Sequence, residues 1–165
     1  MFQPDRLKTV LAILRQPPQA EAALRGSSLY PELRGRTRFY QTPWGVLTAT
    51  QVRGLPTAPG SCGGRFFALH IHQGGACGGT EADPFADAGS HYDPGRCPHP
   101  DHAGDLPPLL GAGGQAFQIT LTDRFSLEEI LGKTVILHSH PDDFTTQPAG
   151  DVGQKIACGV IRRGP

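Results

Sequence analysis

Short apolar runs separated by Gly- and Pro-rich stretches make up most of the chain beyond Ala22. Their alternation and their β-branched and aromatic residues predict strands at 36–41, 46–52, 65–72, 115–123, 133–140 and 155–161. Residues 43–45, "PWG", separate the first two runs and predict a hairpin turn. Many short strands with long connections are typical of a Greek-key β-barrel or sandwich, so we expect an all-β fold.

Two segments predict helix or turn instead. Residues 5–15, "DRLKTVLAILR", carry apolar residues at helical spacing, with Asp5 as the expected N-cap. We expect this helix either to dock on the domain or to form an oligomer contact. Residues 126–132, "SLEEILG", predict a turn or a short helix. The chain thus divides into an expected N-terminal helical extension, residues 1–20, and a main domain, residues 21–165.

One irregular stretch, predicted at 73–115, is unusually long for a connection within a compact domain. Further loops are expected at 53–64 and 142–154. Connections of this length are uncommon unless they carry function. We therefore look for chemistry in these loops.

The charge balance limits the classes of partner. The chain has 15 Lys and Arg and 15 Asp and Glu, which argues against general electrostatic binding to nucleic acid or to an anionic membrane. No apolar stretch is long enough to span a bilayer, and no clear signal-peptide cleavage site follows the N-terminal run. We expect a soluble, cytoplasmic protein.

Four cysteines, Cys62, Cys77, Cys97 and Cys158, lack the CxxC spacing of zinc ribbons and thioredoxin motifs. Their spacing leaves two states open, free thiols or one to two disulfides.

Histidines provide the strongest chemical signal. His70 and His72 alternate along one predicted strand and therefore face the same side, about 7 Å apart along the strand. His138 ends another apolar strand, and the long loop holds further imidazoles and a carboxylate. Imidazole sets without sulfur suit copper, and three imidazoles with a carboxylate suit tetrahedral zinc. The pattern predicts a copper site on strands beside a zinc site in a loop.

Several motifs resemble those of copper–zinc superoxide dismutases, and they occur in the family's order. They are "LHIH", "GSHYDP", "HAGDL", "TVILHSHPDD" and "GQKIACGVI", and the resemblance covers about Ala22 to Ile161. It implies an eight-stranded Greek-key β-barrel with long metal-binding and electrostatic loops. It also implies an enzyme that disproportionates superoxide to dioxygen and hydrogen peroxide with copper and zinc as cofactors.

The resemblance further implies a ligand set for each metal. Copper would be bound by His70, His72, His91 and His138. Zinc would be bound by His91, His99, His102 and Asp105. His91 would therefore bridge the metals and carry a proton during catalysis.

Three other residues match supporting positions of the family. Asp142 would link a copper histidine to a zinc histidine through hydrogen bonds. Cys77 and Cys158 would form the disulfide that ties the metal loop to the last strand. Cys62 and Cys97 fall outside the family pattern and either pair with each other or stay thiols. His140 is expected to be a surface histidine without a ligand role.

Two departures from the family are visible. His99 and His102 are three residues apart, where the family has a longer segment, so the zinc loop is compressed. Lys155 stands where the family has the arginine that guides superoxide, and it is expected to take that catalytic role. Lysine supplies the positive charge but lacks the flat pair of donors of a guanidinium.

Two other functions compete with the enzyme. The first is a non-catalytic superoxide dismutase-like metal-binding or copper-delivery domain, and the second is a copper-only enzyme whose compressed loop leaves zinc unbound. The complete set of matched ligands favours the copper–zinc enzyme. Its expected state is a monomer or a homodimer, with superoxide as its substrate.

Overall fold

The computed structural model describes residues 4–57 and 65–164. Eight strands account for most of the regular structure: β1 (Ala20–Gly26), β2 (Arg34–Thr42), β3 (Gly45–Arg53), β4 (Arg65–His72), β5 (Asp105–Gly111), β6 (Gln115–Thr122), β7 (Thr134–His138) and β8 (Lys155–Arg163). The helices are α1 (Pro4–Leu14), α2 (Leu127–Ile130) and the short 3₁₀ helix η1 (Ala86–Ala88). The predicted all-β class is confirmed.

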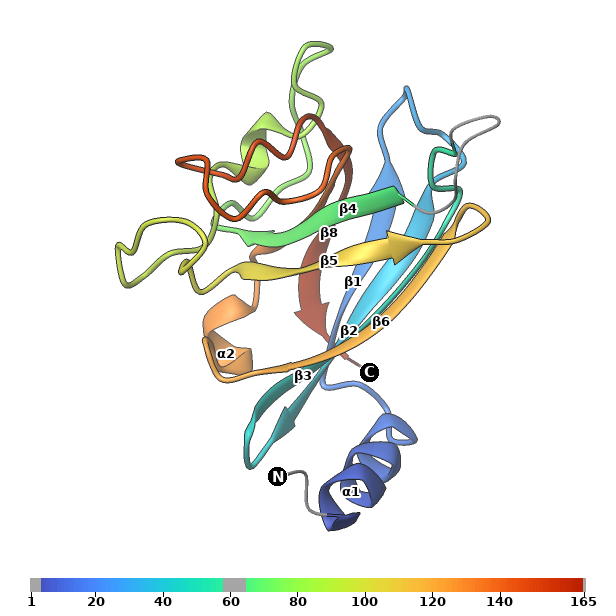
Figure 1. Cartoon of the computed structure of the whole chain (residues 1–165), viewed down its shortest axis with the longest axis vertical. Coiled ribbons are helices and arrows are strands. Elements are labelled where there is room, and N and C mark those ends of the chain that lie inside the picture. Colours follow the sequence, from blue (N-terminus) through green and yellow to red (C-terminus); the bar gives the residue numbers. More distant parts are fainter. Residues whose placement is uncertain (1–3, 58–64, 165) are drawn as a thin grey trace.

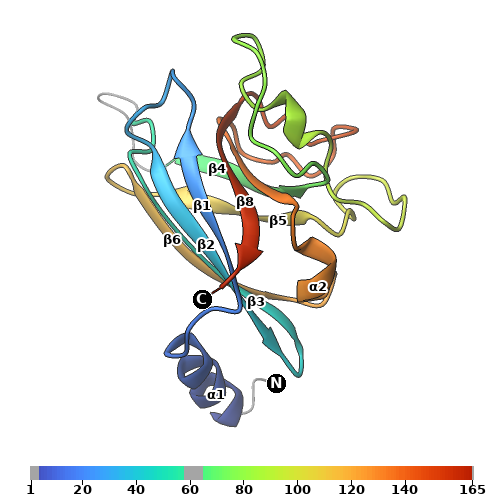
Figure 2. The same cartoon turned by 180° about the vertical axis from the view of Figure 1, so that it is seen from behind.

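The strands form one antiparallel sheet in the order β5-β4-β7-β8-β1-β2-β3-β6, which curls into a nearly closed barrel (Figures 1 and 2). Within the described residues, the edge strands β5 and β6 face each other without a ladder of backbone hydrogen bonds. Pro107 and Pro108 lie in β5 and have no N–H to donate, which suits an edge position. The Gln118 side chain of β6 donates to the Pro107 carbonyl over 2.9 Å and bridges the gap.

Six strands match the predicted runs, and the predicted hairpin joins β2 to β3. The prediction of one irregular stretch over 73–115 is wrong, because η1 and β5 lie within it. β5 was not predicted because its sequence "DLPPLLG" contains two prolines. β1 was not predicted because its sequence "AEAALRG" contains three Ala and a Glu, which are not typical of strands. Both segments become strands through pairing with neighbours that lie far away in the sequence.

Helix α1 lies apart from the barrel at the end near the β2–β3 hairpin (Figure 1). It begins at Pro4, so the predicted N-cap Asp5 lies inside the helix instead of before it. Leu7 is 63% exposed and Leu11 51% exposed, so these side chains do not dock on the barrel. The oligomer-contact alternative stays a prediction. No helix among the described residues is long and apolar enough to cross a bilayer.

Two apolar clusters fix the frame that carries the site. The main core fills the barrel and includes Leu24, Phe39 and Phe67. A smaller cluster lies on the other side of β7 and β8, where Phe85 and other loop residues pack on Ile136 and Cys158. All five residues of β7 are buried, because the barrel covers one face and the loops cover the other. This loop-covered face, the outer side of β4, β7 and β8 beneath residues 73–104 and 139–154, holds the histidines.

Candidate metal centre

Two groups of ligating side chains lie next to each other on the loop-covered face. The histidine group consists of His70, His72, His91 and His138, and the mixed group consists of His91, His99, His102 and Asp105. Within each group, the ligand atoms all lie within 4.8 Å of one another, and every member is buried. The structure thus brings together every side chain predicted from the sequence as a metal ligand. Which metal each group binds stays a prediction.

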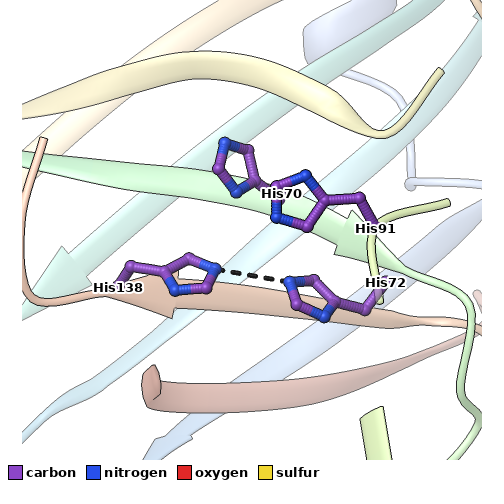
Figure 3. A group of neighbouring side chains, drawn as sticks. All are labelled: His70, His72, His91 and His138. Carbon is purple, nitrogen blue, oxygen red and sulfur yellow. Dashed lines mark hydrogen bonds between the residues drawn. The ribbon is translucent and has the colours of Figure 1, made fainter. Parts of the chain in front are cut away.

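The strands place three members of the histidine group. His70 and His72 alternate along β4, and His70 pairs with Ile136 of the neighbouring β7. His138 lies two residues further along β7 and so faces the same side. The Nε2 atoms of His72 and His138 approach to 3.3 Å (Figure 3). Two imidazole nitrogens at this distance, on strands fixed by backbone pairing, form a preorganised pair of donors.

The loop brings His91 to the strands through backbone contacts. His91 forms an isolated antiparallel bridge with His72, and the Tyr92 N–H donates to the Ile71 carbonyl over 2.8 Å. The ring centroids of His91 and His70 are 4.1 Å apart. The residue that joins the two groups is therefore held by the main chain on β4.

Hydrogen bonds fix which nitrogen of β4's histidines is free. The Nδ1 of His72 donates to the Gly89 carbonyl over 2.7 Å, which leaves the lone pair on Nε2. The Nε2 of His70 donates to Asp142 over 2.9 Å, which leaves the lone pair on Nδ1. That Nδ1 is buried and has no hydrogen-bond partner among the described residues. A buried acceptor without a partner is costly, and a metal ion would satisfy it.

The short segment between His99 and His102 still brings the two imidazoles together. The rings of His99 and His102 lie 5.5 Å apart between centroids, within the turn "HPDH". Asp105 lies between them, with its Oδ2 2.9 Å from His99 Nδ1 and 3.1 Å from His102 Nδ1. His99 Nδ1 is buried and makes no hydrogen bond with any described residue despite this approach. Three nitrogens and a carboxylate converge here, which is the donor set that zinc prefers.

His91 offers one nitrogen to each group. Its Nδ1 lies 2.7 Å from Asp105 and 3.3 Å from His102 Nδ1, on the side of the mixed group. Its Nε2 is buried and has no hydrogen-bond partner in the described parts of the chain. Figure 3 shows this ring next to His70, facing the pair formed by His72 and His138. One imidazole therefore stands between two sets of donors.

Asp142 connects the two groups from behind. Its Oδ2 accepts from His70 and its Oδ1 accepts from His99 over 2.8 Å and from the Phe144 backbone N–H. Burial raises the pKa of Asp142, but the hydrogen bonds from His70, Phe144 and His99 outweigh it and lower the pKa to about 2. Asp142 thus stays ionised and fixes one ring of each group.

Burial keeps three members of the histidine group, His70, His72 and His138, neutral. It lowers the pKa of His72 to about 3 and lowers the pKa of His70 and His138 as well. Neighbouring histidines lower these pKa values further, since two imidazolium charges so close would repel. Neutral imidazole is the form that binds a metal, so the site is prepared at neutral pH without losing a proton.

Comparison with known proteins now decides the family. The family model of copper/zinc superoxide dismutase matches residues 33–161. The chain belongs to this family. A Cu-Zn superoxide dismutase from Deinococcus radiodurans is 31% identical over 149 residues, which cover 79% of this chain and 78% of that protein.

Solved structures agree with this assignment. A double mutant of a SOD-like protein from Bacillus subtilis, 29% identical, superposes with a TM-score of 0.72 and covers 84% of this chain and 94% of that chain. The Cu/Zn superoxide dismutase from Brucella abortus, 23% identical, shares the fold with a TM-score of 0.69 over 86% of this chain and 98% of that chain. The eight-stranded barrel predicted from the superoxide dismutase resemblance is confirmed.

Lys155 lies beside the histidine group of this superoxide dismutase fold. It pairs with His138 across β7 and β8, and its positive charge contributes to lowering the pKa of His72 and His138. Its Nζ donates to Asp83 over 2.7 Å and to the Phe85 carbonyl over 3.3 Å. The side chain is 18% exposed. Its charge thus reaches the group but is partly neutralised by a loop carboxylate.

The cysteines differ in state. Cys77 and Cys158 form a disulfide that ties the loop to β8, with 5.7 Å between their Cα atoms. Cys97 is a free, exposed thiol, and Cys62 lies outside the described residues. The predicted loop at 53–64 is likewise described only as far as residue 57. His140 is exposed, as predicted.

Two contributors to the site were not predicted from the sequence. The Gly89 carbonyl orients His72, and Asp83 binds Lys155. Every residue has a backbone carbonyl, so the type of residue 89 does not indicate this contact. Asp83 is one of several acidic residues in its loop. Neither had a signal that could have distinguished it.

Proposed function

We propose that this chain disproportionates superoxide, with copper bound by the histidine group and zinc bound by the mixed group. Two superoxide ions and two protons give one dioxygen and one hydrogen peroxide. Copper supplies the one-electron oxidation and reduction, since imidazole donors suit both of its redox states. Zinc, held by the mixed group, would supply order to the loop.

One observation carries this proposal, which is that His91 belongs to both groups. Its Nδ1 lies on the side of the mixed group, and its unpartnered Nε2 is left for the three other imidazoles of the histidine group. A structural cluster of histidines would be expected to satisfy its buried nitrogens internally. In the described part of the chain, three ring nitrogens that face the two groups instead remain buried without a hydrogen bond: His70 Nδ1, His91 Nε2 and His99 Nδ1. Two metals sharing one imidazole account for this arrangement.

The protein's own side chains have distinct tasks in the proposed reaction. His91 would hold one proton at Nε2 and deliver it to the second superoxide, while solvent supplies the other proton of the hydrogen peroxide. Asp142 keeps His70 and His99 in fixed tautomers, so neither ring rotates between turnovers. Lys155 supplies a positive charge that attracts the anionic substrate toward His138.

The competing function is copper delivery by a non-catalytic relative of the family. Such a domain needs a copper site that releases its ion to a partner. The donors here are fixed by strands, by a disulfide and by Asp142, which favours retention of the metal over release. The complete mixed group likewise favours the copper–zinc enzyme over a copper-only one.

Metal analysis and turnover on the same sample test the proposal. Protein produced with both metals should contain one copper and one zinc per chain, and superoxide should decay catalytically, with many turnovers per copper. Copper that leaves to an acceptor without turnover would instead support delivery. Copper without zinc, together with full activity, would support a copper-only enzyme.

Other features stay predictions from the sequence. These are the cytoplasmic location, the monomeric or homodimeric state, the lack of nucleic-acid and membrane partners, and the division into residues 1–20 and 21–165. The exposed leucines of α1 support the proposed division, since no residue of this helix whose burial is described belongs to the barrel core.

A further inference from the structure

An arginine row crosses the bare outer face of the barrel, far in sequence from the metal ligands. Arg25 of β1 pairs with Arg34 of β2, which pairs with Arg53 of β3. Their side chains point outward from three neighbouring strands, with about 5 Å between paired Cα atoms. Figure 2 views the molecule from the side of these strands. Like charges directly opposite each other destabilise a sheet, so this row calls for a reason.

Carboxylates do not neutralise the row. Glu21 binds Arg36 over 3.4 Å and Arg38 over 3.1 Å. These two arginines are the next outward residues of β2 after Arg34. In contrast, Arg25, Arg34 and Arg53 have no hydrogen bond or ion pair from their side chains within the described parts of the chain. The face therefore keeps an unopposed positive charge although the whole chain is neutral.

These guanidinium groups surround a depression. A hollow of about 430 Å³ is lined by the three arginines, by Arg36, and by the side-chain amides of Gln51 and Gln115. Ala23 forms part of its floor, where a larger side chain would fill the space. No carboxylate lines this hollow among the described residues.

A second, larger hollow on the same face differs in charge. It measures about 930 Å³ and shares Ala23, Arg25 and Arg36 with the first. However, it contains Glu21, whose carboxylate already occupies two of its arginines. The unopposed charge therefore belongs to the smaller hollow, which has the size of a small-molecule site.

We propose that this smaller hollow binds a linear oligophosphate, for which inorganic tripolyphosphate is the simplest probe. Guanidinium groups bind phosphate oxygens through paired, charge-assisted hydrogen bonds. Three in a row match successive groups along a phosphate chain, and the glutamine amides supply neutral donors to the remaining oxygens. Binding would also relieve the repulsion within the row.

The surroundings favour the phosphate chain over a nucleic acid. No aromatic side chain lines the hollow among the described residues, so a nucleobase would find no stacking platform. The row spans about 10 Å across the sheet, which offers contact to few phosphates of a duplex. A nucleoside triphosphate should therefore bind through its phosphates alone, with an affinity close to that of tripolyphosphate.

Calorimetric titration of the metal-loaded protein with tripolyphosphate tests this site. Arg34→Gln should weaken binding by about tenfold or more, because it removes a charged donor from the middle of the row. Arg65→Gln is the matched control, since it makes the same charge change on exposed β4, and it should stay within about twofold of the parent. Arg53→Gln, on another strand, replaces Arg34→Gln if that variant fails to fold.

Thermal unfolding separates a ligand site from a structural role. Tripolyphosphate should raise the unfolding temperature of the parent and of Arg65→Gln but not that of Arg34→Gln. Without ligand, Arg34→Gln should unfold at the same or a higher temperature than the parent, since repulsion is removed. Equal heats in all three proteins would mean chelation of the bound metals or an adventitious ion only, and would overturn the proposal. Tighter binding of duplex DNA than of tripolyphosphate would overturn it as well.

Discussion

The barrel has two outer faces whose polar residues differ in burial and in charge. On the loop-covered face, the outward residues of β4 and β7 include three histidines, all buried beneath residues 73–104 and 139–154. On the bare face, outward residues of β1, β2 and β3 include the arginine row, in contact with solvent. The same alternation along the strands places both sets.

The difference shows what a covering loop does to polar chemistry. Burial lowers the pKa of His72 to about 3 and forces each ring to find a partner or a metal. Solvent allows the arginines to remain charged and unpaired, because water screens their repulsion. Strand geometry sets which way a side chain points. Whether loops bury that side chain then determines whether it is a neutral candidate ligand or an exposed charge.

The largest expected effect comes from removing a donor on the loop-covered face. His72→Ala should abolish copper binding and superoxide decay while zinc remains, because Nε2 of His72 belongs to the histidine group alone. Metal analysis and a superoxide-decay assay measure both. His140→Ala, an exposed histidine close to the site, should keep both metals and full activity. Full activity in His72→Ala would remove the copper assignment.

The second-largest effect is expected from the loss of the disulfide that joins the covering loop to β8. Cys158→Ser opens a disulfide with a sequence separation of 81, and should lower the free energy of unfolding by about 4 kcal/mol in the chain-entropy model. Urea unfolding of the oxidised, metal-free protein measures this. Cys97→Ser, at an exposed free thiol, should change little. Equal midpoints for the two variants would contradict the expectation.

Asp142→Asn should weaken the hold on both groups without changing the size of the side chain. Loss of such an orienting carboxylate typically costs about 10–100-fold in metal affinity. Competition with a chelator should reveal weaker binding of both copper and zinc, since Asp142 contacts His70 and His99. Asp143→Asn provides the control, because Asp143 is exposed and, within the described chain, accepts hydrogen bonds only from nearby loop residues such as Thr145 and Thr146. A loss restricted to one metal would argue against the link.

Lys155 tests whether charge at the edge of the covered face guides the substrate. At low salt, Lys155→Arg should be faster than the parent, Lys155→Ala slower by about tenfold, and Lys155→Glu slowest. Added salt should slow the parent, because screening shortens the reach of the charge. If Lys155→Glu matched the parent, the substrate would approach the histidine group elsewhere.

The ion pair with Asp83 sharpens this test. Asp83→Asn removes the carboxylate that lies 2.7 Å from Nζ and should therefore raise the rate at low salt. Asp87→Asn, an exposed carboxylate of the same loop, controls for the general loss of negative charge. An equal gain in both variants would assign the effect to net charge and not to the release of Lys155.

The smallest effect is expected on the bare face. Arg34→Gln should leave superoxide decay within about twofold of the parent at physiological salt, because Arg34 lies on the bare face of β2 and salt screens its charge. The superoxide-decay assay on the metal-loaded variant measures this. A large loss would mean that the two faces are coupled.

Local sequence determined much of this protein. Alternation and β-branched residues located six strands, and the spacing of His70 and His72 was enough to place both rings on one face of a strand. The order of the motifs identified the family, and the resemblance led from there to the other predicted ligands and to Asp142, which the structure brings together. These inferences were possible because each depends on neighbouring residues or on a short contiguous motif that resembles the family.

Tertiary structure alone decided the rest. β1 and β5 became strands against their composition, because their backbone groups pair with β8, β2 and β4. The turn that brings His99 to His102, the Gly89 carbonyl on His72 and the pairing of Asp83 with Lys155 all depend on how distant loops lie on the sheet. The cross-strand register that aligns Arg25, Arg34 and Arg53 is likewise absent from any local pattern, since register is set by the packing of whole strands.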